Sequence, residues 1–170
     1  GALASRPNAP LAALAEFDEK AHFDATQLRL MDRFSLMALF AANQAVAASQ
    51  GALAGADRSR AGLFMGNGMG GTLTMDAGYK TLYGDMSDRI KPFTILMGMH
   101  NAATAWIGMA HDVQGPALTY STACSSSAVA IGEAWLRVAS GQLDVALAGG
   151  AEAPLSCGSL KAWEALHTGA

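Results

Sequence analysis

The chain has 170 residues, of which 51% are hydrophobic, so it can bury a substantial core and we expect a globular protein. Its net charge of −3, from 11 Lys+Arg against 14 Asp+Glu without a basic cluster, argues against nucleic acid and anionic membranes as partners. Apolar runs stay shorter than the roughly 20 residues of a membrane span, and the first residues lack the pattern of a secretory signal. We expect a cytoplasmic protein.

The first part of the chain alternates between helical and strand-like patterns. Residues 28–49 place apolar side chains at three- and four-residue steps and end at Gly51, which predicts a helix. "AGLFMG" (61–66) predicts a short buried strand, and "TLTMDAGYKTLY" (72–83) a helix. Residues 92–110 begin with a proline and continue as an alanine-rich segment that favours helix.

The second part of the chain gives the fold class. "PALTYSTA" (116–123) predicts a strand, "SSSAVAIGEAWLRVAS" (125–140) a helix, and "DVALAGG" (144–150) a second, fully apolar strand. Such a strand, helix and strand form a right-handed βαβ unit in a parallel sheet that is covered on both faces. The sequence therefore predicts an α/β protein.

Cys124 lies between the strand at 116–123 and the helix at 125–140. In parallel sheets, binding and chemistry gather at such junctions because helix amides point into the crevice there. The positive end of a helix dipole favours a thiolate, and the small neighbours Ala123 and Ser125 to Ser127 suit a sharp turn. A free cysteine is otherwise often a small buried hydrophobe. The residues alone leave both interpretations open.

The second cysteine adds little to this choice. Neither Cys124 nor Cys157 lies in a spacing that holds zinc, so we expect no metal site. A disulfide between the two is disfavoured in an intracellular chain.

"TYSTACSSSAVAIGEAWLRVASGQLDVALAGGAEAPL" (119–155) closely resembles the active-site segment of β-ketoacyl synthases, the condensing enzymes of fatty-acid and polyketide synthesis in the thiolase superfamily. "TACSSS" matches the nucleophile turn of that family, and "ALAGGAE" its glycine-ended strand. The likeness extends from about residue 17 onward and includes "GLFMGNGMGG" and "KPFTILMGMHNAATAWIGMAHDVQGPA". It implies a thiolase-like layered αβαβα fold.

By the same resemblance, residues 1–170 are a single partial domain, the N-terminal half of a ketosynthase without its first strand and second half. The chain begins without methionine and ends directly after a helical pattern, which also indicates a piece of a longer protein. Because the absent parts would pack on this half, we expect exposed apolar surface.

The resemblance gives Cys124 the role of the residue that receives an acyl group as a thioester. An acyl carrier protein delivers the acyl chain on phosphopantetheine, and the Cys124 amide supplies half of an oxyanion hole. A malonyl carrier thioester then loses carbon dioxide and attacks the acyl-cysteine in a Claisen condensation. No further cofactor is implied.

In this family two histidines and a lysine that assist decarboxylation lie in the second half of the fold. His22, His100 and His111 match none of those positions, so we expect them to be solvated or structural. His167 follows Cys124 too closely to be one of the pair, and we expect it at the surface or a helix end.

The family's acyl pocket implies four further residues by position, namely Met69, Thr94, Ala123 and Trp163. Met69 and Trp163 are bulky and would shorten or redirect the tunnel for the acyl chain. An ordinary core position is an equal alternative for Trp163.

"GNGMGG" also satisfies the dinucleotide-binding pattern G-x-G-x-x-G through Gly66, Gly68 and Gly71, with Asp88 near the expected acidic position. The second strand of that motif would have to cover residues 87–92, whose Pro, Asp and Arg content does not suit a buried strand. We favour a glycine loop that packs beneath the active site, and expect no hydride chemistry.

The resemblance also implies partners: an acyl carrier protein, the remaining half of the fold, and an identical or related ketosynthase subunit paired through the strand before the nucleophile. Cys124 favours the catalytic subunit, and "TACSSS" slightly favours a polyketide role. Two alternatives remain. One is another cysteine acyltransferase or hydrolase on a thiolase-like fold, and the other is a noncatalytic partner subunit.

Overall fold

The computed structural model describes residues 15–166, whose centre is a three-stranded parallel sheet in the order β2-β1-β3. The strands are β1 (Ala61–Gly66), β2 (Ala117–Tyr120) and β3 (Val145–Gly150). Leu63 of β1 pairs with Ala117 on one side and with Leu147 on the other. The predicted parallel sheet is confirmed, and β1 lies between the two strands of the predicted βαβ unit.

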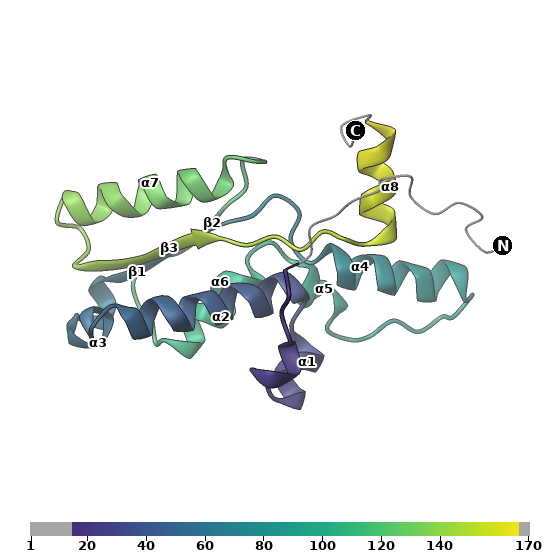
Figure 1. Cartoon of the computed structure of the whole chain (residues 1–170), viewed down its shortest axis with the longest axis horizontal. Coiled ribbons are helices and arrows are strands. Elements are labelled where there is room, and N and C mark those ends of the chain that lie inside the picture. Colours follow the sequence, from purple (N-terminus) through teal and green to yellow (C-terminus); the bar gives the residue numbers. More distant parts are fainter. Residues whose placement is uncertain (1–14, 167–170) are drawn as a thin grey trace.

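Helices cover both faces of this sheet (Figure 1). Helix α7 (Ser126–Ala139) packs on one face, whereas α2 (Arg33–Ala48) and α6 (Ala102–Ala110) lie on the other. Successive side chains of β1 point alternately to the two faces of the sheet. Leu63 and Met65 join the core beneath α2 and α6, and Phe64 joins a second core beneath α7. Every residue of β1 is buried, as expected for a central parallel strand.

The helix predicted over residues 28–49 is broken into α1 (Ala25–Leu30) and α2. The physical reason is Asp32, an N-cap whose carboxylate accepts hydrogen bonds from the amides of Phe34 (3.2 Å) and Thr74 (2.8 Å). Short helices and turns flank this region: η1 (Glu19–Ala21), α3 (Ala52–Gly55) and η2 (Arg58–Arg60).

The segment between β1 and β2 also has more breaks than predicted. Helix α4 (Thr72–Tyr79) continues into a π-helical turn, η3 (Lys80–Gly84). The predicted helix at 92–110 is instead two helices, α5 (Thr94–Gly98) and α6, because Met99 is extended. The turn between them contacts the residue that follows β1, because the side-chain amide of Asn67 donates a hydrogen bond to the carbonyl of His100 at 2.7 Å.

The outer face of α7 carries exposed apolar side chains. Trp135 is 67% exposed, and Ile131, Leu136 and Val138 are exposed beside it. Such a patch on a helix that covers a sheet fits the expectation that further structure packs on this half. Among residues 15–166, no helix combines the length and hydropathy needed to cross a bilayer.

Candidate active site

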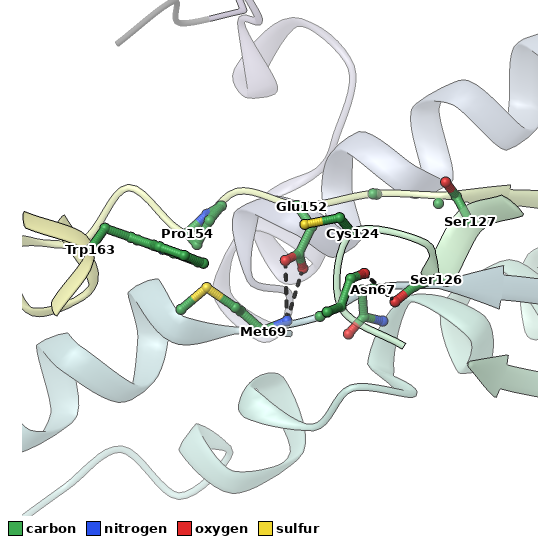
Figure 2. A pocket seen from close by; sticks show the side chains of 13 residues that line it. Asn67, Met69, Cys124, Ser126, Ser127, Glu152, Pro154 and Trp163 are labelled. Carbon is green, nitrogen blue, oxygen red and sulfur yellow. Dashed lines mark hydrogen bonds between the residues drawn. The ribbon is translucent and has the colours of Figure 1, made fainter. Parts of the chain in front are cut away.

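The carboxyl ends of β1 and β3 and the N-terminal end of α7 surround a pocket of about 520 Å³ (Figure 2). It is lined by Gly66, Asn67, Gly68, Met69, Ala123, Cys124, Ser126, Ser127, Gly150, Ala151, Glu152, Pro154 and Trp163. The last of these residues comes from α8 (Cys157–Ala165), which Ser156 caps through a 3.1 Å bond from the amide of Ser159. The pocket therefore opens where parallel sheets place their binding sites.

Cys124 stands in a tight turn two residues before the first helical residue of α7, and its side chain is exposed. Ala123 before it has φ 51°, a left-handed conformation that is uncommon for residues other than glycine. Ser126 is buried and closes the turn, because its Oγ donates to the Ala123 carbonyl (2.6 Å) and accepts from the Thr122 amide (2.8 Å). The turn thus presents the thiol to the pocket and is held by the hydrogen bonds of Ser126.

We expect Ser126→Ala to lower the free energy of unfolding by about 1–3 kcal/mol, since it removes two part-buried hydrogen bonds, one from the Ser126 Oγ to the Ala123 carbonyl and one from the Thr122 amide to that Oγ. Urea titration measures this loss. Ser125→Ala is the matched control, because the exposed Ser125 Oγ donates only to Thr122 atoms and its removal should cost less than about 1 kcal/mol. Equal losses for both variants would contradict the role of Ser126.

Two glycines allow α7 to approach the strands. A Cβ at Gly66 would overlap the backbone of Ser126 and Ser127. A Cβ at Gly150 would lie 2.6 Å from the Ser127 Cβ and 2.8 Å from the Gly66 carbonyl oxygen. Gly149, by contrast, has open space at the same point. Of the adjacent glycines 149 and 150 at the end of β3, only Gly150 is therefore needed for this close packing.

The loop over residues 67–71 lies between the nucleophile turn and the α5–α6 turn. Gly70 has φ 59°, and a Cβ there would lie 3.0 Å from the carbonyl oxygen of Gly98. The next strand in the chain after β1 is β2, and no strand forms over residues 87–92. The strand required by a dinucleotide-binding motif is thus absent from this segment, and the glycines serve close packing.

Three of the four residues expected in the acyl pocket, Met69, Ala123 and Trp163, line the pocket beside Cys124. Thr94 does not. It is buried on α5 and lines a second cavity of about 400 Å³, together with Asp32 and Gly78 among others. Trp163 is 45% exposed in this part of the fold.

Sequence reasoning missed Asn67 and Glu152, which also line the pocket. Asn67 is buried, and Glu152 accepts hydrogen bonds from the amide of Met69 with its two carboxylate oxygens at 3.1 and 3.3 Å. Each follows the carboxyl end of a strand, Asn67 directly and Glu152 by two residues. That position in a parallel sheet is the signal that could have identified them.

The histidines that the structure describes lie away from this pocket. His22 contacts Phe17 and Phe40 through its ring, and the carbonyl of His100 accepts from Asn67. His111 shares a 2.9 Å hydrogen bond with Asn43, and burial together with the nearby Arg58 lowers the pKa of its imidazole. His167 lies outside the described residues.

Both cysteines are free and exposed. Cys157 begins α8 and does not line the pocket. Its thiol, which is also exposed, can therefore serve as a comparison for the reactivity of Cys124.

The layered parallel sheet and the cysteine at its strand-to-helix turn define a thiolase-like α/β protein. The structure superimposes on a β-ketoacyl synthase from Burkholderia phymatum with a TM-score of 0.68 and 27% identity over 88% of this chain and 37% of that one. It also superimposes on a ketosynthase in complex with its chain length factor from Xenorhabdus doucetiae, with a TM-score of 0.72 and 25% identity over 85% and 36% of the two chains.

The chain belongs to the β-ketoacyl synthase family, because the family model "Beta-ketoacyl synthase, N-terminal domain" matches residues 1–170. It is 37% identical to nodulation protein E of Rhizobium meliloti over 146 residues, which cover 86% of this chain and 36% of that protein. It is 33% identical to 3-oxoacyl-[acyl-carrier-protein] synthase 2 of Staphylococcus aureus over 143 residues, or 84% and 34% of the two. The chain spans about a third of the length of these relatives.

Proposed function

We propose that this chain is the nucleophile-bearing part of a β-ketoacyl-acyl carrier protein synthase and that Cys124 is its catalytic cysteine. One observation carries the proposal: an exposed thiol at the N-terminal end of a 14-residue helix faces a pocket with an apolar wall of Met69, Pro154 and Trp163. A helix N-terminus stabilises negative charge, and an apolar wall suits an acyl chain. The family membership gives this arrangement its chemical meaning.

In the proposed reaction the Cys124 sulfur attacks the carbonyl carbon of an acyl thioester. The carrier's phosphopantetheine thiol leaves, and the acyl group stays on Cys124 as a new thioester. The Cys124 amide stabilises the oxyanion of this step. A malonyl carrier thioester then loses carbon dioxide, its carbanion attacks the acyl carbon, and the Cys124 thiolate is released with a β-ketoacyl product.

The decarboxylation step needs two histidines and a lysine, which we propose come from the remaining half of the fold. No imidazole among residues 15–166 lines the pocket, which supports this division of the site. We further propose that substrates arrive on the phosphopantetheine of an acyl carrier protein in the cytoplasm and that no other cofactor is used. The product would serve fatty-acid or polyketide synthesis.

We also propose that β2 pairs with an identical or related ketosynthase subunit. β2 is an edge strand of the described sheet, and Ala117 and Leu118 on it are exposed. An open edge with an apolar side chain is otherwise an aggregation hazard, and pairing across a two-fold axis removes it. The ketosynthase from Xenorhabdus doucetiae is itself in complex with a chain length factor.

The proposal is tested by intact mass measurement after the full-length protein is incubated with an acyl-phosphopantetheine thioester. We expect one acyl mass on the wild-type protein, no adduct on Cys124→Ala, and an unchanged adduct on Cys157→Ala, whose thiol lies outside the pocket. An adduct that persists in Cys124→Ala would refute the assignment.

Two further measurements separate the alternatives. A hydrolase or other acyltransferase would form the adduct but discharge it without decarboxylating a malonyl thioester. A noncatalytic partner subunit would form no adduct, and its Cys124 would react with alkylating agents no faster than Cys157.

A further inference from the structure

Glu152 is held in the pocket by the backbone on both sides of it. The amide of Ala151 donates to the carbonyl of Gly66 at 3.2 Å, and Ala153 is buried. These two anchors fix the point from which the Glu152 side chain extends. Its carboxylate is therefore preorganised beside the loop that follows β1.

The partner of this carboxylate is the amide of Met69, 83 positions away in sequence. Figure 2 shows both oxygens directed at that amide, beside the thiol of Cys124. The two oxygens share one N–H at 3.1 and 3.3 Å and the contact is exposed, so its strength is that of an ordinary hydrogen bond. Glu152 thus ties the loop after β1 to the end of β3.

This bond holds the middle of the loop, whereas the bond from the Gly71 amide to the Gly98 carbonyl at 3.3 Å holds its far end. Met69 lies between Gly68 and Gly70, and glycines restrict the backbone little. Asn67 fixes the start of the loop on the carbonyl of His100, but it lies two positions before Met69. The carboxylate is what holds the Met69 amide itself.

The position of the Met69 backbone decides where its side chain stands in the pocket. In Figure 2 the Met69 and Trp163 side chains reach toward each other, with Pro154 on the same side of Cys124. Displacement of the Met69 backbone would open this side of the pocket.

We propose that Glu152 is a positioning residue that fixes Met69 against Trp163 and thereby limits the size of the acyl group that can reach Cys124. The inference rests on the proposed function for one point only, namely that the group entering the pocket is an acyl chain. The positioning itself is a property of the described residues and can be measured without acyl transfer.

The test compares the rates at which N-ethylmaleimide and N-octylmaleimide add to the Cys124 thiol in the full-length protein, with peptide mass spectrometry to locate the adduct. Glu152→Ala should raise the octyl-to-ethyl rate ratio roughly threefold, the scale of one ordinary hydrogen bond. Glu152→Gln keeps an acceptor oxygen and should return the ratio toward wild type. Glu16→Ala removes an exposed carboxylate elsewhere and is the control.

A second readout follows the loop directly. Hydrogen exchange of a peptide covering residues 66–71 should accelerate in Glu152→Ala and stay near wild type in Glu152→Gln. Exchange in β1 and α2 shows whether the variant remains folded.

A third variant tests whether Glu152 acts through Met69. Met69→Ala should raise the same octyl-to-ethyl ratio, and the double variant should show no further increase, because both changes remove one constraint. If Glu152→Ala does not fold, Glu152→Asp gives the same test, because its shorter side chain withdraws the carboxylate from the Met69 amide and should raise the ratio.

An unchanged ratio in Glu152→Ala or Met69→Ala would overturn the proposal, as would unchanged exchange over residues 66–71 or a failure of Glu152→Gln to restore the ratio. If the wild-type protein forms no acyl adduct, the proposed function fails, while the maleimide ratio and the exchange still decide whether Glu152 positions Met69.

Discussion

Gly66→Ala is expected to lower the free energy of unfolding by at least about 3 kcal/mol and to slow alkylation of Cys124. The added methyl group would overlap backbone atoms of Ser126 and Ser127, which are the first two residues of α7. Backbone cannot rotate away as a flexible side chain can, so the helix start and the nucleophile turn must move. Chemical denaturation and the rate of iodoacetamide reaction at Cys124 measure the two effects.

Gly132→Ala is the matched control for this prediction. Gly132 lies within α7, and a Cβ there meets no atom within 4 Å. The substitution should therefore stabilise the protein by about 0.4–1 kcal/mol through the helix propensity of alanine and its smaller unfolded-state entropy. If Gly66→Ala proved as harmless as Gly132→Ala, close contact between β1 and α7 would not be what positions Cys124.

Phe64→Ala is expected to cost about 3–5 kcal/mol in the free energy of unfolding. Phe64 is fully buried on β1 and packs with Ala130, Ala134 and Leu143 in the core beneath α7. Because these neighbours are mostly small, they cannot close the cavity that the lost ring would leave. Urea unfolding should show the loss.

Phe64→Leu is the comparison for this second prediction. It retains most of the buried volume and should cost less than half as much as Phe64→Ala. Hydrogen exchange should show faster opening of α7 than of α2 in Phe64→Ala, since Phe64 joins the core on the α7 side. Equal losses for the two variants, or faster opening of α2, would contradict this assignment of the core.

Several strands and helices could be predicted from short local patterns in the sequence. The buried apolar run at 61–66 and the glycine-ended run at 144–150 became β1 and β3, and the alanine-rich pattern after Cys124 became α7. The breaks were harder to predict, because apolar periodicity continued across Asp32 and across Met99. Asp32 caps α2 partly through a partner 42 positions away, the Thr74 amide, which no local pattern contains.

Some residues of the candidate site could also be predicted from the sequence, and others could not. The position of Cys124 between a strand and a helix left nucleophile and buried thiol both open, and the family resemblance decided between them. The same resemblance predicted Met69, Ala123 and Trp163, which line one pocket with Cys124. The same positional transfer put Thr94 in the pocket, whereas α5 carries it into a second cavity. The one signal for Glu152 was its place two residues after the end of a strand, and its partner, the Met69 amide, lies 83 positions away.

The sequence by itself determined the α/β class, the strand-to-helix turn at Cys124 and the small residues that this turn requires, because these depend on neighbours within a few positions. Only the tertiary structure decided that β1 lies between β2 and β3, that Gly66 and Gly150 must admit the start of α7, and that Glu152 meets the amide of Met69. These contacts join residues 23 to 83 positions apart, or strands that are not consecutive in the chain. Close packing between distant segments depends on shape and register rather than on local propensity, so a single sequence does not reveal it.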